Sequence, residues 1–349
     1  MRGVLAAPYP RSMAFSLDDL TCPLVAAPMA GGVSTPSLVA AVARAGAIGF
    51  LAGGYLSASQ VRDDIAAVRS LGASAFGVNL FWPPGRPADL SAAQAYRTLL
   101  APEAERRGVI LPQPHDDDDA IEAKLGVVAE EAVPVVSFTF GVPGADVVGR
   151  LHRAGCRVWA TVTSASEAVI AGRSGVDLLI VQGPDAGGHR ATFDPDLAPP
   201  TQDLGALVEA VRAVSDLPIV VTGGLTTPEQ VGRWRGQVAG VQVGTALLDA
   251  EEAGTSPTYR RALRDPEFTS TELTRAFSGR YARGLRNGFM TAFGDQAPAA
   301  YPAVHQLTAP LRRAASTQDD PEGMSLWAGT SWTAAPTGPA ARILAGLMR

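Results

Sequence analysis

Eight short apolar runs, rich in Val, Ile and Leu, recur along the chain, and polar turns and segments with helical spacing separate them. Within each run the apolar character is nearly continuous rather than alternating. This pattern is typical of parallel strands that are covered on both faces, because neither face meets water. The predicted strands are residues 24–29, 47–52, 76–81, 135–140, 157–162, 178–183, 219–224 and 240–247.

The intervening segments predict the crossover helices of βα units, over residues 36–45, 58–71, 145–154, 166–174, 204–214 and 228–235. Several begin after Ser or Thr and end before Gly, as in the pairs Thr35/Gly46, Ser57/Gly72 and Thr227/Gly236. These are helix-capping residues. Eight such units favour an α/β fold of the closed (β/α)8 TIM-barrel type over a doubly wound open sheet, which usually has fewer strands.

Two regions depart from the repeat. Residues 82–131 form a long, Pro-rich connection with predicted helices near 91–108 and 120–131, and with an acidic run at 116–119 that we interpret as a solvated loop rather than a metal site. In the tail, residues 259–263, 273–277 and 307–313 look helical and no further strand is predicted. We therefore expect a barrel domain of residues 18–81 and 132–256, and a small helical lid of residues 82–131 and 257–349.

Composition excludes several classes of function. The 349 residues carry 29 Lys and Arg against 34 Asp and Glu, a net charge of −5, which gives no general attraction to nucleic acid or to anionic lipid. No apolar stretch approaches the ~20 residues that span a bilayer, and the first residues lack the apolar region of a signal peptide. Only Cys22 and Cys156 are present, so no disulfide framework or zinc site is expected. We expect a cytoplasmic protein.

The predicted strand ends carry the candidate chemistry, because active sites of TIM barrels lie at the carboxyl ends of the strands. The seventh strand ends in Gly223 and Gly224, and the eighth in Gly244 and Thr245, each just before a predicted helical segment. Glycines let backbone N–H groups approach an anion, and this fold commonly binds phosphate after its last two strands. The pair of sites therefore predicts a phosphate-binding cradle, although tight turns alone would also explain the glycines.

A Gly-rich loop with a histidine follows the sixth strand, reading QGPDAGGHR over residues 182–190. Placed at the barrel mouth, His189 is a candidate hydrogen-bond donor, base or cationic partner near neutral pH. Met29 and Asn79 stand at other strand ends, where packing and turn chemistry explain them equally well. The remaining three histidines are interpreted as surface or packing residues, and no Ser-His-Asp order, P-loop or HExxH pattern is present.

These segments resemble the nitronate monooxygenases, the flavin-dependent family formerly called 2-nitropropane dioxygenases. The resemblance extends from about residue 20 to the C-terminus. The matching segments, in family order, are PLVAAPMAGG (23–32), GVNLF (77–81), VVSFTFGVP (135–143), VQGPDAGGHR (181–190), IVVTGGLTTPEQV (219–231), GVQVGTALL (240–248), FSGRYARGLRNGF (277–289) and LWAGTSW (326–332).

The resemblance implies an FMN cofactor and no metal. Gly223, Gly224, Gly244 and Thr245 would hold the phosphate, and His189 would bind an anionic nitronate beside the flavin or, in some members, deprotonate a nitroalkane. The implied substrates are O2 and alkyl nitronates such as propionate 3-nitronate, with a carbonyl compound and nitrite as products. The residues implied to contact the isoalloxazine or ribityl chain are Met29, Asn79, Gln182, Gly187 and Gln242.

Two departures from the family pattern bear on the substrate. Thr139 stands where many bacterial members carry His, and Thr330 where many carry Gln. Two other functions stay open: an FMN-dependent NAD(P)H reductase of enoyl-acyl-carrier-protein or quinone type on the same barrel, and a flavin-binding partner protein without turnover. A homodimer is also compatible with the sequence.

Overall fold

The computed structural model describes residue 17 and residues 20–349, and it contains a closed barrel of eight parallel strands. The last strand pairs with the first, with Leu24 opposite Val241, which closes the sheet. The expected start of the barrel segment at residue 18 lies outside the described residues. The TIM-barrel prediction is confirmed. The barrel strands are β1 (Leu24–Ala26), β2 (Ile48–Ala52), β3 (Phe76–Phe81), β4 (Val135–Thr139), β5 (Arg157–Val162), β6 (Leu178–Gln182), β8 (Ile219–Thr222) and β9 (Gly240–Val243).

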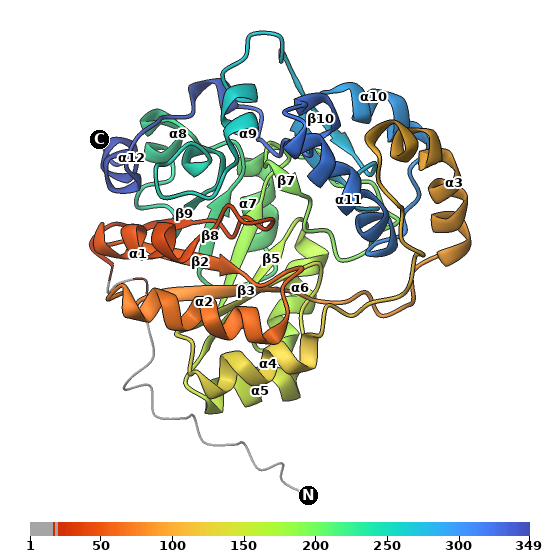
Figure 1. The fold of residues 1–349 in the computed structure, drawn as a ribbon. Coiled ribbons are helices and arrows are strands. Elements are labelled where there is room, and N and C mark those ends of the chain that lie inside the picture. The colour runs from red at the N-terminus through yellow and green to blue at the C-terminus, as the bar shows by residue number, and fades with distance from the viewer. Residues whose placement is uncertain (1–16, 18–19) are drawn as a thin grey trace, which may run out of the picture.

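Helices connect successive barrel strands and cover their outer face (Figure 1). The predicted caps form: the Thr35 hydroxyl accepts a hydrogen bond from Leu38 N, and Ser57 makes a capping box with Gln60. The continuous apolar runs are explained by this covering, because one side of each strand packs against helices and the other fills the barrel interior. The connecting helices are α1 (Pro36–Arg44), α2 (Ala58–Ser70), α4 (Ile121–Glu130), α5 (Ala145–Arg153), α6 (Ala165–Ser174), α7 (Leu204–Arg212) and α8 (Pro228–Gly232).

A helical cap stands beside the mouth of the barrel, at the upper right in Figure 1. It is built from α3 (Leu90–Arg107), which belongs to the connection between β3 and β4, and from α10 (Gly288–Phe293) and α11 (Ala303–Thr317) near the C-terminus. These helices share an apolar cluster that includes Tyr96 and Leu307. Distant parts of the chain therefore form one structure over the barrel.

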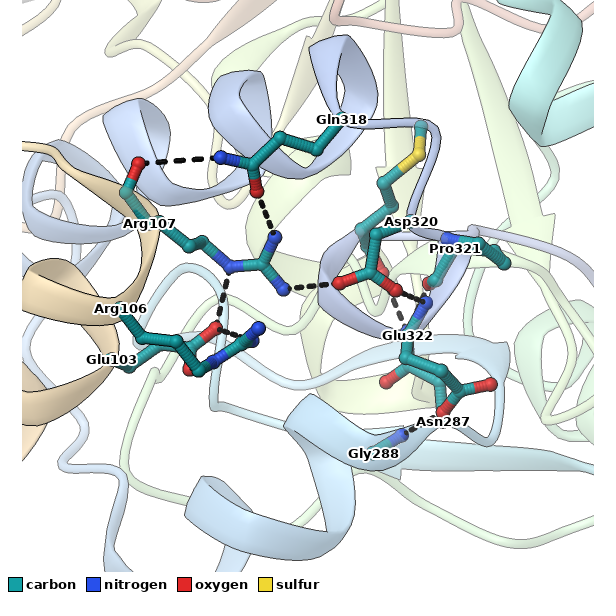
Figure 2. Close-up of polar contacts among 10 residues, drawn as sticks. Glu103, Arg106, Arg107, Asn287, Gly288, Gln318, Asp320, Pro321 and Glu322 are labelled. Atoms are coloured by element: carbon teal, nitrogen blue, oxygen red, sulfur yellow. Dashed lines mark hydrogen bonds and ion pairs between the residues drawn. The ribbon is translucent and has the colours of Figure 1, made fainter.

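Arg107 fastens the two halves of the cap, as Figure 2 shows. Its side chain is almost fully buried and forms ion pairs with Glu103 on α3 and with Asp320, which follows α11. The Nη1 group also donates to Gln318 Oε1 at 3.1 Å. Two carboxylates and an amide oxygen thus compensate the buried guanidinium, which is the condition for burying a charge without a large penalty.

The tail contains strands that the sequence pattern did not predict. Strands β10 (Thr271–Thr274) and β11 (Ala282–Leu285) form an antiparallel pair, and β11 also pairs with β7 (Gly188–His189), the end of the Gly-rich loop. The expected helix over residues 273–277 is therefore wrong. The physical reason is tertiary, since β10 and β11 are four residues each and are stabilised by pairing with each other and with the loop rather than by a long apolar run.

Two helices pack differently from the expected division of the chain. Helix α4, expected in the lid, contacts α2 and β3, and its apolar residues join the outer core of the barrel. Helix α12 (Ala340–Leu347) returns from the tail to contact α1 and α8. The other segments are α9 (Pro257–Ala262) and the short 3-10 helices η2 (Thr245–Leu247), η3 (Gly294–Gln296), η4 (Pro321–Gly323) and η5 (Trp332–Ala334).

Candidate functional site

A cavity of about 530 Å³ lies where the carboxyl ends of the barrel strands meet the cap. Its lining combines strand-end residues with side chains of α11 and of the segment 324–327. This is the expected place for a ligand site in a TIM barrel. All ten residues predicted for the site line this cavity: Met29, Asn79, Gln182, Gly187, His189, Gly223, Gly224, Gln242, Gly244 and Thr245.

One end of the cavity is a cradle of backbone groups. Gly223 and Gly224 have φ of +117° and +70°, conformations that side chains rarely adopt. A Cβ at Gly224 would also lie 2.7 Å from the Cβ of Asp185. The neighbouring turn supplies Gly244 and Thr245, and Gly329 N donates to Thr245 Oγ1 at 3.0 Å. The cradle has room for an anionic group and has glycines where backbone must come close to it.

The amide side chains around the cavity differ in how many of their hydrogen bonds are already made. Gln182, at the start of the Gly-rich loop, binds the far end of the loop, donating to His189 O and accepting from Ala191 N, both at 3.0 Å. Asn79 donates to Ser137 and Thr139. By contrast, Gln242 Oε1 is buried without a partner. An orphaned buried acceptor in the wall, together with the glycine cradle, fits a flavin with its phosphate in the cradle.

The Gly-rich loop is held by close backbone packing. A Cβ at Gly187 would lie 2.4 Å from Gly329 N, so only glycine fits there.

The two residues that depart from the family pattern lie in different places. Thr139 lines the cavity and accepts from Asn79 Nδ2 at 3.0 Å. Thr330 donates its backbone N–H to Asp185 O at 3.1 Å and lies near Gly224, beside the cradle rather than at the substrate side where we expected it.

His189 lies in the cavity wall among aromatic rings, including Phe140 and Trp327 with ring centroids at 5.4 and 5.8 Å. Its Nε2 is 2.8 Å from Ser278 Oγ, which also accepts from Arg280 N at 3.3 Å. Burial, together with the nearby guanidinium groups of Arg280 and Arg312, lowers the pKa of His189 to about 3. The imidazole is therefore neutral at physiological pH.

Two arginines surround this histidine without acidic partners. Arg280 is 1% exposed, stacks over Phe140 at 4.0 Å, and leaves Nε and Nη2 without hydrogen bonds. Arg312 lines the cavity and leaves Nε unpaired. Burial lowers the pKa of each to about 10, so both stay charged near neutral pH. Over the described part of the chain, neither forms a salt bridge with a carboxylate, so the cavity has an excess of positive charge.

The sequence analysis missed these cap residues. His305, interpreted as a surface or packing residue, stacks on Tyr55 with centroids 3.7 Å apart and lines the cavity. Its Nδ1 is 3.1 Å from Arg312 Nη2. The seven-residue spacing of His305 and Arg312, two turns of one helix face, was a usable signal. The contact between His305 and Tyr55 had no such signal in the sequence, since 250 residues separate the two rings.

Other kinds of site receive no support. Within residue 17 and residues 20–349 no group of three or more His, Cys, Asp or Glu side chains is arranged to hold a metal ion. No helix in that part of the chain has the length and apolarity to cross a membrane.

Comparisons with known proteins agree with this geometry. The model of the nitronate monooxygenase family matches residues 16–349. A probable nitronate monooxygenase of Staphylococcus aureus (strain Newman) is 33% identical over 340 residues, 93% of each chain. The crystal structure of nitroalkane oxidase from Streptomyces ansochromogenes superposes with a TM-score of 0.90 at 43% identity, over 95% of each chain.

A more distant structure supports the fold alone. FabK from Thermotoga maritima superposes with a TM-score of 0.73 at 23% identity, covering 95% of this chain and 93% of that one. The barrel, the cavity at its carboxyl ends and the family match over nearly the whole chain lead to one conclusion: this chain belongs to the nitronate monooxygenase family and is a flavin-dependent oxidoreductase.

Proposed function

We propose that this protein is an FMN-dependent nitronate monooxygenase, which oxidises alkyl nitronates with O2 to a carbonyl compound and nitrite. One observation carries the choice of substrate: the neutral imidazole of His189 lies beside two guanidinium groups that have no acidic partner. A nitronate is the anion of a nitroalkane, so this excess of positive charge favours binding of the nitronate over the neutral compound.

The low basicity of His189 points the same way. A general base works best when its pKa lies near the operating pH. With a pKa of about 3, His189 is poorly matched to removing a proton from a neutral nitroalkane. Its role is then to bind and orient: the contact of Nε2 with Ser278 Oγ at 2.8 Å holds the neutral ring in the cavity wall, where it can hydrogen-bond the substrate. The surrounding rings of Phe140 and Trp327 limit access of water.

The cofactor is proposed to be FMN, with its phosphate on Gly223, Gly224, Gly244 and Thr245. Gln242, whose Oε1 is buried and unpartnered, would meet the flavin ring system or its ribityl chain. When bound, the flavin supplies the electron transfer that no amino-acid side chain of this site provides. The single phosphate cradle suits a mononucleotide.

A spectroscopic experiment tests both parts of the proposal. The purified protein is examined for a flavin spectrum, and the extracted cofactor is weighed by mass spectrometry. Anaerobic samples then receive either propionate 3-nitronate or NADPH. Bleaching by the nitronate, with aerobic nitrite release, supports the proposal. Bleaching by NADPH alone would assign a reductase, and a flavin that neither reagent bleaches would indicate a binding protein without turnover.

The variant His189→Asn separates cofactor binding from catalysis. It removes the imidazole but leaves the glycine cradle intact. We expect it to purify with FMN and to oxidise the nitronate about 100-fold more slowly, a typical loss for a positioned polar group. Unchanged turnover would exclude His189 from the reaction.

A further inference from the structure

Arg312 on α11 is a cation in the cavity wall whose hydrogen bonds are incomplete. Its Nη2 group donates to Nδ1 of His305 at 3.1 Å and lies 3.4 Å from the carbonyl oxygen of the same residue, while Nε has no partner. His305 contributes no charge, because burial and Arg312 hold its pKa well below the ordinary value. A guanidinium anchored by a neutral ring and facing a cavity is incomplete without an anionic ligand.

Tyr55 contacts the same histidine and also has an unused donor. Its ring stacks on His305 with an interplanar angle of 5°. Its hydroxyl is buried beside the hydroxyl of Tyr301, neither group has another hydrogen-bond partner among the described residues, and Tyr55 lines the cavity. Arg312 and Tyr55 therefore offer a charged and a neutral donor around one imidazole.

The fold maintains Tyr55 in an unfavourable conformation. Its φ of 68° lies in the left-handed region, which is rare and strained for a bulky residue. The backbone N–H of Tyr55 donates to Asp119 Oδ1 at 3.0 Å, and the same oxygen pairs with Lys124 Nζ at 2.7 Å. The Lys124 side chain is fully buried. A buried ion pair from another connection thus holds the backbone that presents this ring.

We propose that Arg312 and Tyr55, which both contact His305, form a binding subsite for a carboxylate carried by the organic chain of the substrate. This inference deepens the proposed function and rests on it, because the nitronate group itself is assigned to His189. Carboxylates without a nitro group are expected to bind the same subsite.

The donor set favours a carboxylate among the common anions. A planar guanidinium matches the two oxygens of a carboxylate, and a single hydroxyl can donate to one of them. The charge of Arg312 balances a single negative charge, and the neutral hydroxyl of Tyr55 adds a hydrogen-bond donor. The proposed phosphate cradle differs from this subsite because its donors are backbone N–H groups and not side chains. It is contributed by other elements, at Gly223, Gly224, Gly244 and Thr245.

Two nitronates of the same shape test the subsite. Propionate 3-nitronate carries the carboxylate, and 3-methylbutyl nitronate replaces its two oxygens by methyl groups. We expect Arg312→Gln to lower kcat/KM for the first at least about tenfold more than for the second, because the second loses only the general attraction of this guanidinium for the anionic nitronate and not a charge-assisted hydrogen bond. Tyr55→Phe should give a smaller loss with the same selectivity. The control is Arg173→Gln, which removes an exposed arginine of α6 and should affect neither substrate.

Calorimetry measures ligand binding directly and needs no turnover. The wild-type protein is titrated with propionate and with its neutral analogue propionamide, and only propionate should bind. The same titration on Arg312→Gln should show binding weakened at least about tenfold. Equal binding of both ligands to the wild type, or equal loss of both nitronate activities in Arg312→Gln, would overturn the subsite. If neither nitronate is oxidised by the wild type, the proposed function fails, and the calorimetry still decides the subsite.

Discussion

The neutral state of His189 leads to a direct prediction about pH. The chain has four histidines, and His189 alone lies beside both Arg280 and Ser278. With a folded-state pKa of about 3, its imidazole should take up no proton between pH 8 and pH 5. In a protein labelled with ¹³C at histidine, the His189 resonance should therefore stay fixed over this range. It is assigned by its absence from His189→Asn.

The same pKa fixes an effect on stability. The unfolded chain protonates His189 below pH 6.5, while the folded protein does not until about pH 3, so the free energy of unfolding falls as the pH falls between these values. At pH 5 the loss in the free energy of unfolding amounts to about 2 kcal/mol, since pH 5 lies about 1.5 units below the unfolded-state pKa and one unit corresponds to about 1.4 kcal/mol. His189→Asn should lose that part of the pH dependence in urea titrations at pH 8 and pH 5.

His115→Asn is the matched control, because its imidazole is exposed. A His189 resonance that titrates near pH 6.5, or parallel falls in stability for wild type and His189→Asn, would refute the neutral imidazole and with it the argument for nitronate binding.

Three further substitutions test other parts of the structure. Gly224→Val combines a positive φ with a Cβ 2.7 Å from another side chain, so the purified protein should hold less flavin per chain in its visible spectrum. Lys124→Met leaves Asp119 without its buried partner and should cost about 3–5 kcal/mol in urea unfolding, most of which Asp119→Asn in the same chain should recover. Arg107→Met leaves Asp320 without its ion-pair partner and Glu103 with Arg106 alone, and it should cost about 3 kcal/mol, with faster hydrogen exchange confined to α3 and α11.

The barrel was predictable from the sequence because its strands are buried on both faces. Each carries a nearly continuous apolar run, and the capping residues between the runs mark the helix ends by local chemistry. The cradle residues Gly223 and Gly244 could be placed for the same reason, since strand order determines which turns meet at the barrel mouth. Strands β10 and β11 could not, because each has only four residues and β11 is stabilised in part by pairing with β7, about 90 residues earlier in the chain.

The cap side of the site was predictable only in part. The spacing of His305 and Arg312 places both on one helix face, but Tyr55 meets them only because α11 folds over the β2–α2 connection, and no local pattern encodes that contact. The acidic run behaved in two ways. Residues 116–118 are exposed, as a solvated loop should be, but Asp119 turns inward to a buried lysine. Neighbouring identical residues can therefore have opposite environments.

The ion pair of Arg107 with Asp320 can form only late in synthesis of the chain. Asp320 follows Arg107 by 213 residues, so at roughly 5–20 residues per second a ribosome needs ~10–40 s to deliver it. Throughout that interval α3 has been made but its packing partner α11 has not, and Tyr96 and Leu100 face water or a chaperone. Because the helix that covers the cavity, α11, is translated after every barrel strand, a nascent chain passes through a stage in which all eight barrel strands have been made and the mouth is not yet covered. That stage gives a bulky cofactor its widest route of entry.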